Sequence, residues 1–363
     1  MDNPTSKKRS FKVGKIDFQI KKNIGWLITS RILVLTIFLG TTFACTQQSV
    51  DGFYENRSIT ILVGSGPGGV TDTSARIIAG FLEDHIPGRP TVIVQNMPGG
   101  GGVTMANHVY RSSARDGTVL GYSLPGVILA QLMEPGRAKY DGREFGWIGS
   151  AITVTNMISV LSDSPVKTLE DTRHTEIIIG ATGRGSPLYQ LPAIAKELLD
   201  LQIRIITGYQ GSSEITLAME RGEVDGQAAA LDYWSLSRPE WLTNGQLTYL
   251  AYIGPADERA PNAPHLGELV SSDQEKELIT FLETGSNMGW PLFAPPGIPA
   301  ARLTVLRNAF SEMLQTEEFA EAVWTSMRTP VNPTQGEALQ TTVEMALETP
   351  ESVIAEVKEL LGI

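Results

Sequence analysis

The chain has 363 residues, of which 42% are hydrophobic and 19% charged, so it is long enough for two domains of ordinary size. Its formal net charge of −11 is uneven, because residues 1–45 hold eight Lys or Arg against two Asp, which leaves 21 basic and 38 acidic residues in the remainder. An acidic body without a basic stripe argues against nucleic acid as a partner. The single cysteine, Cys45, excludes an intramolecular disulfide.

Residues 1–45 have the order of an export signal. A basic leader precedes an apolar run at 32–39, and small or polar residues follow it up to Cys45. Ala44-Cys45 resembles the end of a lipoprotein signal, although Thr42 and Phe43 fit that motif poorly. Lipidation of Cys45, cleavage after Ala44 with a free thiol, and an uncleaved anchor all stay open. We expect a periplasmic or otherwise extracytoplasmic protein, with a lipid anchor at Cys45 as one form.

Short apolar runs rich in β-branched residues alternate with amphipathic segments along the rest of the chain. The strand expected at 59–63 precedes a helix at 71–85, in which Ala75, Ile78, Ala79 and Leu82 share one face. We expect Thr71 or Asp72 to cap this helix. The remaining expected elements are strands at 91–95, 118–124, 147–160, 177–181, 203–207, 226–231 and 247–253, a helix around 107–110, and two helical stretches after residue 300. This alternation predicts an α/β fold with mainly parallel sheets flanked by helices.

A glycine-rich loop, residues 64–72, follows the first expected strand. It fits the dinucleotide pattern G-x-G-x-x-G, but the next strand ends in Gln95-Asn96 and offers no acid for a ribose. A P-loop would need Lys where Val70 stands. The loop fits an anion better, because glycines admit a ligand close to the backbone and the helix N-terminus supplies N–H groups. A plain strand–helix turn remains the alternative.

Several segments, in order and spacing, resemble the solute receptors of tripartite tricarboxylate transporters (TctC, the Bug family). The resemblance rests on Gly68-Gly69-Val70-Thr71-Asp72, Asn96-Met97-Pro98-Gly99-Gly100-Gly101-Gly102, Gly183-Arg184-Gly185-Ser186-Pro187, Tyr209-Gln210-Gly211, Asn287-Met288-Gly289-Trp290 and Ala294-Pro295-Pro296-Gly297-Ile298-Pro299. The chain departs from that family at Met97 and Gln210, which stand where basic residues are usual. These departures leave the identity of the ligand open.

The resemblance implies two α/β lobes that close as a clamp, like other periplasmic binding proteins. After the export segment 1–45, the first lobe would comprise 46–155 and 251–363, and the second lobe 156–250. Family members hold a carboxylate between loops of both lobes, largely through backbone amides and water. The loops of this chain predict a ligand-binding set of Gly66, Gly68, Gly69, Thr71, Asp72, Arg184, Gly185, Ser186, Tyr209, Gly211 and Asp232.

The polar members of this set have alternatives. Arg184 fits a second carboxylate through two parallel hydrogen bonds, or is a solvated loop residue. Ser186 can cap the following helix or hold an anion. Tyr209 is expected at a cleft wall or in the core, and Asp232 after a strand, at the hinge or mouth.

An enzymatic function is disfavoured. The four histidines show no metal-binding spacing, and no G-x-S-x-G segment is present, so we expect no catalytic residue, metal or cofactor. The sequence predicts a solute-binding protein that captures a small organic anion for a tripartite tricarboxylate-type transporter, acts as a monomer and docks on membrane permease subunits. A ligand-sensing receptor for signalling is the alternative, and a nucleotide-dependent enzyme is the least favoured interpretation.

Overall fold

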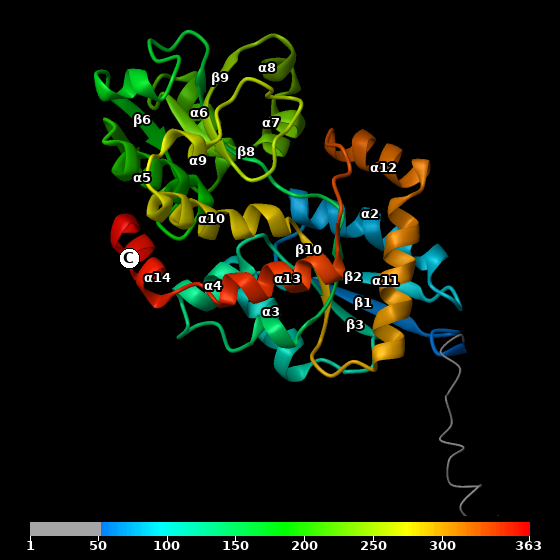
Figure 1. Ribbon diagram of the computed structural model, residues 1–363. Coiled ribbons are helices and arrows are strands. Elements are labelled where there is room, and N and C mark those ends of the chain that lie inside the picture. Colours follow the sequence, from blue (N-terminus) through cyan, green and yellow to red (C-terminus); the bar gives the residue numbers. More distant parts are fainter. Residues whose placement is uncertain (1–51) are drawn as a thin grey trace, which may run out of the picture. The chain divides into compact units, whose positions relative to one another are not determined.

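Two β-sheets, each covered by helices, organise residues 52–363, the part of the chain that this computed structural model describes (Figure 1). The export segment and Cys45 lie outside the described residues. The first sheet has the order β11-β4-β10-β3-β1-β2. Its strands are β1 (Ser58–Val63), β2 (Thr91–Asn96), β3 (Val119–Tyr122), β4 (Gly146–Ser150), β10 (Pro291–Ala294) and β11 (Thr334–Gln335). β1 is parallel to β2 and β3, whereas β10 runs antiparallel to β3 and β4.

Side chains of the first sheet alternate between two cores, as the period of two in a β-strand requires. Ile59, Ile61 and Val63 pack with α2 (Val70–His85), α11 (Ala300–Leu314) and α12 (Glu317–Met327). Leu62 points to the opposite core. That core is built with the helices α3 (Val103–Ser112), α4 (Val127–Met133) and α13 (Gly336–Leu347).

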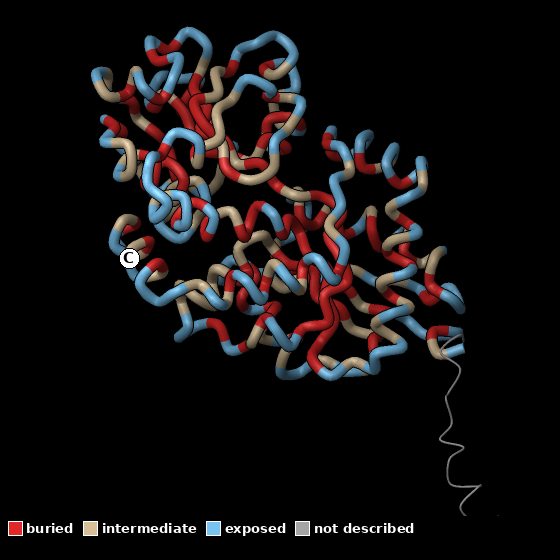
Figure 2. The backbone as a smooth tube through the Cα atoms, in the orientation of Figure 1, coloured by how far each residue is buried: buried red, intermediate tan, exposed pale blue. Residues whose placement is uncertain are grey.

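The second sheet has the order β7-β6-β8-β5-β9. Its strands are β5 (Asn156–Leu161), β6 (Ile177–Gly180), β7 (Ile203–Ile206), β8 (Gly226–Ala230) and β9 (Leu247–Ile253). One face packs on α5 (Pro187–Leu199), α9 (Leu266–Leu269), α10 (Asp273–Met288) and α14 (Glu351–Leu361), and the other on α6 (Ser212–Glu220), α7 (Leu231–Ser237) and α8 (Pro239–Thr243). Buried residues follow the strands of both sheets (Figure 2). We call each sheet with its helices a lobe.

The predicted α/β class is confirmed, with parallel core strands in both sheets. The expected strand at 147–160 proves to be two strands in different sheets, because the chain leaves β4 at Ser150 and enters β5 at Asn156. The two helical stretches expected after residue 300 are four helices, α11 to α14. Short 3-10 turns complete the fold at Gly100–Gly102 (η2), Gly142–Glu144 (η3) and Glu170–Arg173 (η4).

Three segments connect the lobes: 151–155, the stretch that includes α10, and the link from α13 to α14. α10 belongs to both cores, since Leu278 and Phe281 pack in the second lobe and Met288 in the first. Val353 and Val357 of α14 also pack in the second lobe. The boundaries 156–250 and 251–363 remain a prediction from sequence, and these contacts show that much of 251–363 packs with the second sheet.

Candidate functional site

Four α-helices within residues 52–363 have glycine as the N-cap residue, and each follows a strand of the parallel cores. They are α2 after β1, α3 after β2, α4 after β3 and α6 after β7, with the N-caps Gly69, Gly102, Gly126 and Gly211. Glycine has no side chain with which to satisfy the first N–H groups of a helix. By contrast, Ser272 caps α10 with a full capping box and Thr316 caps α12. The carboxyl ends of the core strands therefore present uncapped, partially positive helix ends.

The first glycine loop leaves open space above its backbone. A Cβ atom on Gly66 or Gly69 would meet no heavy atom within 4 Å among the described residues, and the φ of Gly69 is −85°. Neither packing nor backbone conformation therefore demands glycine at these two positions. Gly68, with a φ of +84°, does require glycine for its conformation. Gly69 is also the N-cap of α2, a position at which glycine is favoured, and neither Gly66 nor Gly69 lines the cavity described below.

The buried carboxylate of Asp72 holds the first glycine loop in place through hydrogen bonds. Its Oδ2 accepts hydrogen bonds from the backbone N–H of Gly68 at 2.9 Å and from Nε of Arg76 at 3.0 Å. Its Oδ1 accepts from Nη2 of Arg76 at 3.0 Å and from Nδ2 of Asn96 at 2.8 Å. The hydrogen bond from Arg76 is the main reason why the pKa of Asp72 falls to about 2. The buried carboxylate is thus occupied by donors of its own chain and fixes the shape of the loop.

The capping residue of α2 differs from expectation. Thr71 and Asp72 were expected as N-caps, but both lie inside the first turn, and Gly69 is the N-cap. Thr71 is buried, and its carbonyl oxygen accepts a hydrogen bond from Ser74 Oγ at 3.0 Å. The helix therefore begins at Val70, one residue earlier than predicted, directly at the end of the glycine loop.

The second glycine loop is shaped by backbone conformation. Gly99, Gly100, Gly101 and Gly102 have φ values of 140°, 57°, 66° and 93°, which side chains other than glycine rarely adopt. A Cβ on Gly102 would also lie 3.1 Å from Ser123 Oγ, and one on Gly64 would lie 3.0 Å from the Cα of Gly102. The four consecutive glycines therefore allow the loops that follow β1, β2 and β3 to pack closely against one another.

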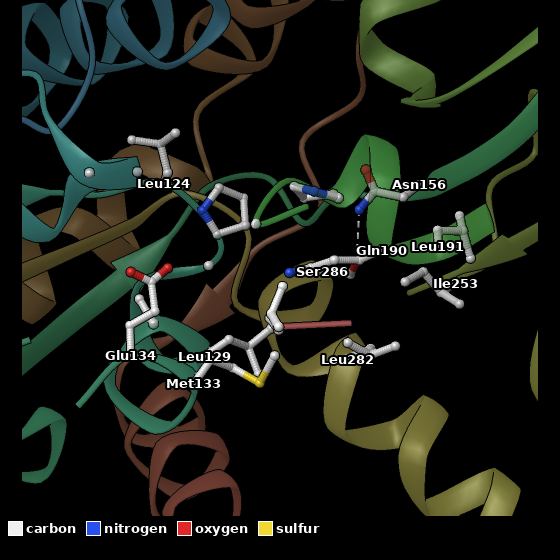
Figure 3. A pocket seen from close by; sticks show the side chains of 18 of the residues that line it. Leu124, Leu129, Met133, Glu134, Asn156, Gln190, Leu191, Ile253, Leu282 and Ser286 are labelled. Carbon is white, nitrogen blue, oxygen red and sulfur yellow. Dashed lines mark hydrogen bonds between the residues drawn. The ribbon is translucent and has the colours of Figure 1, made fainter. Parts of the chain in front are cut away.

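A cavity of about 360 Å³ is lined by loops and helices of both lobes (Figure 3). Gly100 and Gly101 line it from the second glycine loop of the first lobe, and Gly185 from the β6–α5 loop of the second. Across the lobes, a Cβ on Gly185 would lie 3.9 Å from Oε1 of Glu134 on the α4 side. Cavities of this size at the carboxyl ends of parallel strands are typical small-molecule sites.

Of the predicted ligand-binding residues, Gly185 lines this cavity, whereas Arg184 and the residues predicted in the first glycine loop do not. The guanidinium of Arg184 donates from Nη1 to the carbonyl oxygens of Leu361 at 3.2 Å and Gly362 at 2.8 Å. It therefore binds the C-terminal end of α14, where orphan carbonyls collect. Ser186 is the N-cap residue of α5, but its hydroxyl accepts from Thr182 at 2.7 Å and bonds no N–H of the helix.

Tyr209, Gly211 and Asp232 occupy the other loops at the same edge of the second sheet. Tyr209 is half-buried against the core formed with α6 and α7, and Gly211 opens α6 in extended backbone with a φ of 174°. Asp232 is buried and pairs with Nη2 of Arg259 at 2.8 Å. It also accepts from Thr329, which follows α12 of the first lobe. Asp232 thus joins α7 to the other lobe, and its place at the hinge or mouth remains a prediction.

The sequence analysis missed the side chains that come to the cavity from α4, β5 and α10. Nδ2 of Asn156 donates to Oγ of Ser286 at 3.0 Å, and both residues line the cavity together with Glu134. A signal for α4 was present, because Leu124-Pro125-Gly126 is a third turn after a parallel strand. No local signal joins Asn156 and Ser286, which lie 130 positions apart.

Neither a metal-binding cluster nor a membrane-spanning helix is found among the described residues. No group of three or more His, Cys, Asp or Glu in residues 52–363 is placed to hold a metal ion. In the same region, no helix is both long and apolar enough to cross a bilayer.

Comparison with known proteins agrees with this fold. Residues 75–357 match the family described as "Tripartite tricarboxylate transporter family receptor" (TctC). Protein BugT of Bordetella pertussis is 25% identical over 315 residues, which are 84% of this chain and 90% of that protein. A TctC solute binding protein from Polaromonas has a TM-score of 0.65 at 19% identity and covers 85% of this chain and 99% of its own. R. palustris Rpa4515, solved with adipate, has a TM-score of 0.62 at 20% identity, over 85% and 98% of the two chains.

The family match spans most of the described chain and confirms the resemblance seen in the sequence. The solved structures share the two-lobed periplasmic-binding-protein fold. The chain belongs to the TctC (Bug) family of tripartite tricarboxylate transporter receptors, which are solute-binding proteins and not enzymes.

Proposed function

We propose that this receptor captures a small organic anion, a carboxylate, between its two lobes outside the inner membrane and presents it to the permease subunits of a tripartite transporter. The observation that carries the proposal is the set of glycine-started helices at the carboxyl ends of the core strands in both lobes. Their free N–H groups and dipoles favour an anion without any need for a positively charged chain.

The proposal accommodates the acidic composition of the protein. A ligand carboxylate bound to helix N-termini needs local donors, so the net charge of −11 does not oppose binding over a short distance. The adipate bound to a structural relative is a small carboxylate of this kind. Binding to loops of both lobes would favour a closed arrangement, and the closed arrangement is the form that a membrane partner would recognise.

A thermal-stability screen of the purified protein tests this function. The panel contains mono-, di- and tricarboxylates, amino acids, NAD and ATP. A ligand present at 100 times its dissociation constant should stabilise the folded state by about 2.7 kcal/mol, which is a readily measured shift in Tm. We expect stabilisation by at least one carboxylate and none by the nucleotides. A response to NAD or ATP alone would contradict the proposal.

A further inference from the structure

The cavity shared by the lobes is walled mainly by aliphatic side chains. Leu129 and Met133 of α4 lie on one side of it, and the opposite side carries Leu191, Ile253 and Leu282 (Figure 3). These residues come from α5, β9 and α10 of the second lobe. A ligand body that fills the cavity would therefore exchange water for hydrocarbon contacts on both sides, which favours apolar groups.

The two charged side chains that line the cavity have opposite charges and pair with each other. Glu134 and Arg137 are the acid and the base among its lining residues, and they form an ion pair with each other. The other polar side chains of the lining are uncharged: the Asn156–Ser286 pair and the amide of Gln190. The backbone at Gly100, Gly101 and Gly185 can receive one carboxylate, but further negative charges placed in the cavity would find no unpaired cationic side chain in its lining. Burying unpaired charges is strongly unfavourable.

The volume limits the size of the ligand. About 360 Å³ corresponds to roughly a dozen water-sized groups, if each takes about 30 Å³. The cavity therefore accepts a body of on the order of ten non-hydrogen atoms. A much smaller acid would leave the aliphatic walls in contact with water.

We propose that the ligand is a monocarboxylate with an apolar body, whose carboxylate lies at the glycine loops Gly100–Gly101 and Gly185 and whose hydrocarbon fills the cavity between Met133 and Leu282. This inference rests on the proposed function and narrows its ligand class. It distinguishes this receptor from one built for a compact, highly charged tricarboxylate.

Calorimetric titration of the purified protein with butyrate, hexanoate, octanoate, adipate and citrate tests the ligand class. Each added CH₂ group that is buried should tighten binding about fourfold, so octanoate should bind roughly 15-fold tighter than hexanoate. Hexanoate and adipate have the same chain length and differ by one carboxylate, and we expect adipate to bind at least about tenfold more weakly. Equal affinities along the chain-length series, or tighter binding of adipate or citrate, would overturn the inference.

Substitution of Met133 locates the apolar body. Met133→Gln keeps the length of the side chain but adds an amide, and it should weaken octanoate at least about fivefold while butyrate affinity stays unchanged. The matched control is Met345→Gln, because Met345 of α13 is 61% exposed and lies outside this cavity. Equal effects of the two substitutions, or equal losses for octanoate and butyrate, would contradict the assigned position.

Failure of this inference is separable from failure of the proposed function. If dicarboxylates or tricarboxylates bind and monocarboxylates do not, the receptor function holds and the ligand class is wrong. If no carboxylate binds and a nucleotide does, both proposals fall. The chain-length series uses the wild-type protein, so it tests the inference even if Met133→Gln fails to fold.

Discussion

Asp72 shows how a single buried carboxylate organises a glycine-rich loop. Its two oxygens accept four hydrogen bonds from Gly68, Arg76 and Asn96, and these donors hold its pKa near 2. The charged form is therefore much more stable in the folded protein than in the unfolded chain. The loop that begins α2 depends on this charge.

We expect Asp72→Asn to lower the free energy of unfolding at pH 6 by about 1 kcal/mol, less than the pKa shift alone implies, because the guanidinium of Arg76 is about half exposed and screened by salt. Since the folded-state pKa lies below the ordinary value of 3.8, the contribution is complete above pH 4 and is lost as the pH falls toward 2. Urea unfolding across this pH range checks the prediction.

The exposed Asp163 gives a matched control for this measurement, because Asp163→Asn changes the same chemical group outside the loop. The difference between wild type and Asp72→Asn should shrink to near zero at pH 2. A difference that stays constant from pH 6 to pH 2 would show that the ionised carboxylate of Asp72 contributes nothing to stability.

At the scale of elements, the C-terminal end of α10 lies directly against the segment 151–155, and both are connections between the lobes. Gly289 follows α10 with a φ of 60° and a ψ of −134°, and a Cβ there would lie 1.9 Å from the carbonyl oxygen of Ile152. Ile152 belongs to the segment that leads from β4 to β5. The two connections thus touch backbone to backbone, which only glycine permits.

Gly289→Ala should therefore destabilise the protein by about 3 kcal/mol or more, through the clash and the strained φ. Gly80→Ala is the control, because Gly80 lies in the exposed part of α2 with open space around it, and alanine there should be neutral or stabilising by up to about 1 kcal/mol. Chemical denaturation compares the two. Equal stabilities would mean that the chain around Ile152 relaxes freely.

Elements with clear local boundaries could be predicted from the sequence. The strand at 247–253 matches β9 in full, and the strand expected at 59–63 differs from β1 by one residue, because each is a short run of apolar, aromatic or β-branched residues. The run at 147–160 could not be divided, since Ala151, Ile152 and Val154 continue the apolar pattern through the connection. Their burial comes from packing in the first lobe, which is a tertiary effect.

The candidate site was predictable in part for the same reason. Glycine loops after strands are local signals, and both Gly66–Gly69 and Gly185 do follow strands in the structure, although only Gly185 lines the cavity. The partners of Arg184 and Asp232 were not predictable, because Gly362 and Thr329 lie far away in the sequence. A side chain that looks free for a ligand in the sequence can be occupied by a distant part of the chain.

At the scale of the whole molecule, the lobes share three connections and several polar contacts that bear on their relative motion. Asp232 of α7 pairs with Arg259, and it accepts a hydrogen bond from Thr329 of the first lobe. Arg184 binds the end of α14, which packs with the second lobe, so this contact holds the last part of the third connection on that lobe. A ligand that contacts loops of both lobes would add to these contacts and shift the population toward closure.

The account as a whole claims that backbone amides at uncapped helix ends bind the ligand. The most direct test compares Gly185→Val with Gly80→Val by calorimetric titration of the carboxylate that binds the wild type most tightly. Gly185 lines the cavity from the β6–α5 loop, whereas Gly80 lies in α2 and does not line it. A Cβ on Gly185 would have its nearest neighbour at 3.9 Å, and one on Gly80 would meet no atom within 4 Å among residues 52–363. Gly185→Val should keep its Tm close to that of the wild type and weaken binding at least about 30-fold, or about 2 kcal/mol, whereas Gly80→Val should bind normally. Wild-type affinity in Gly185→Val would contradict the account.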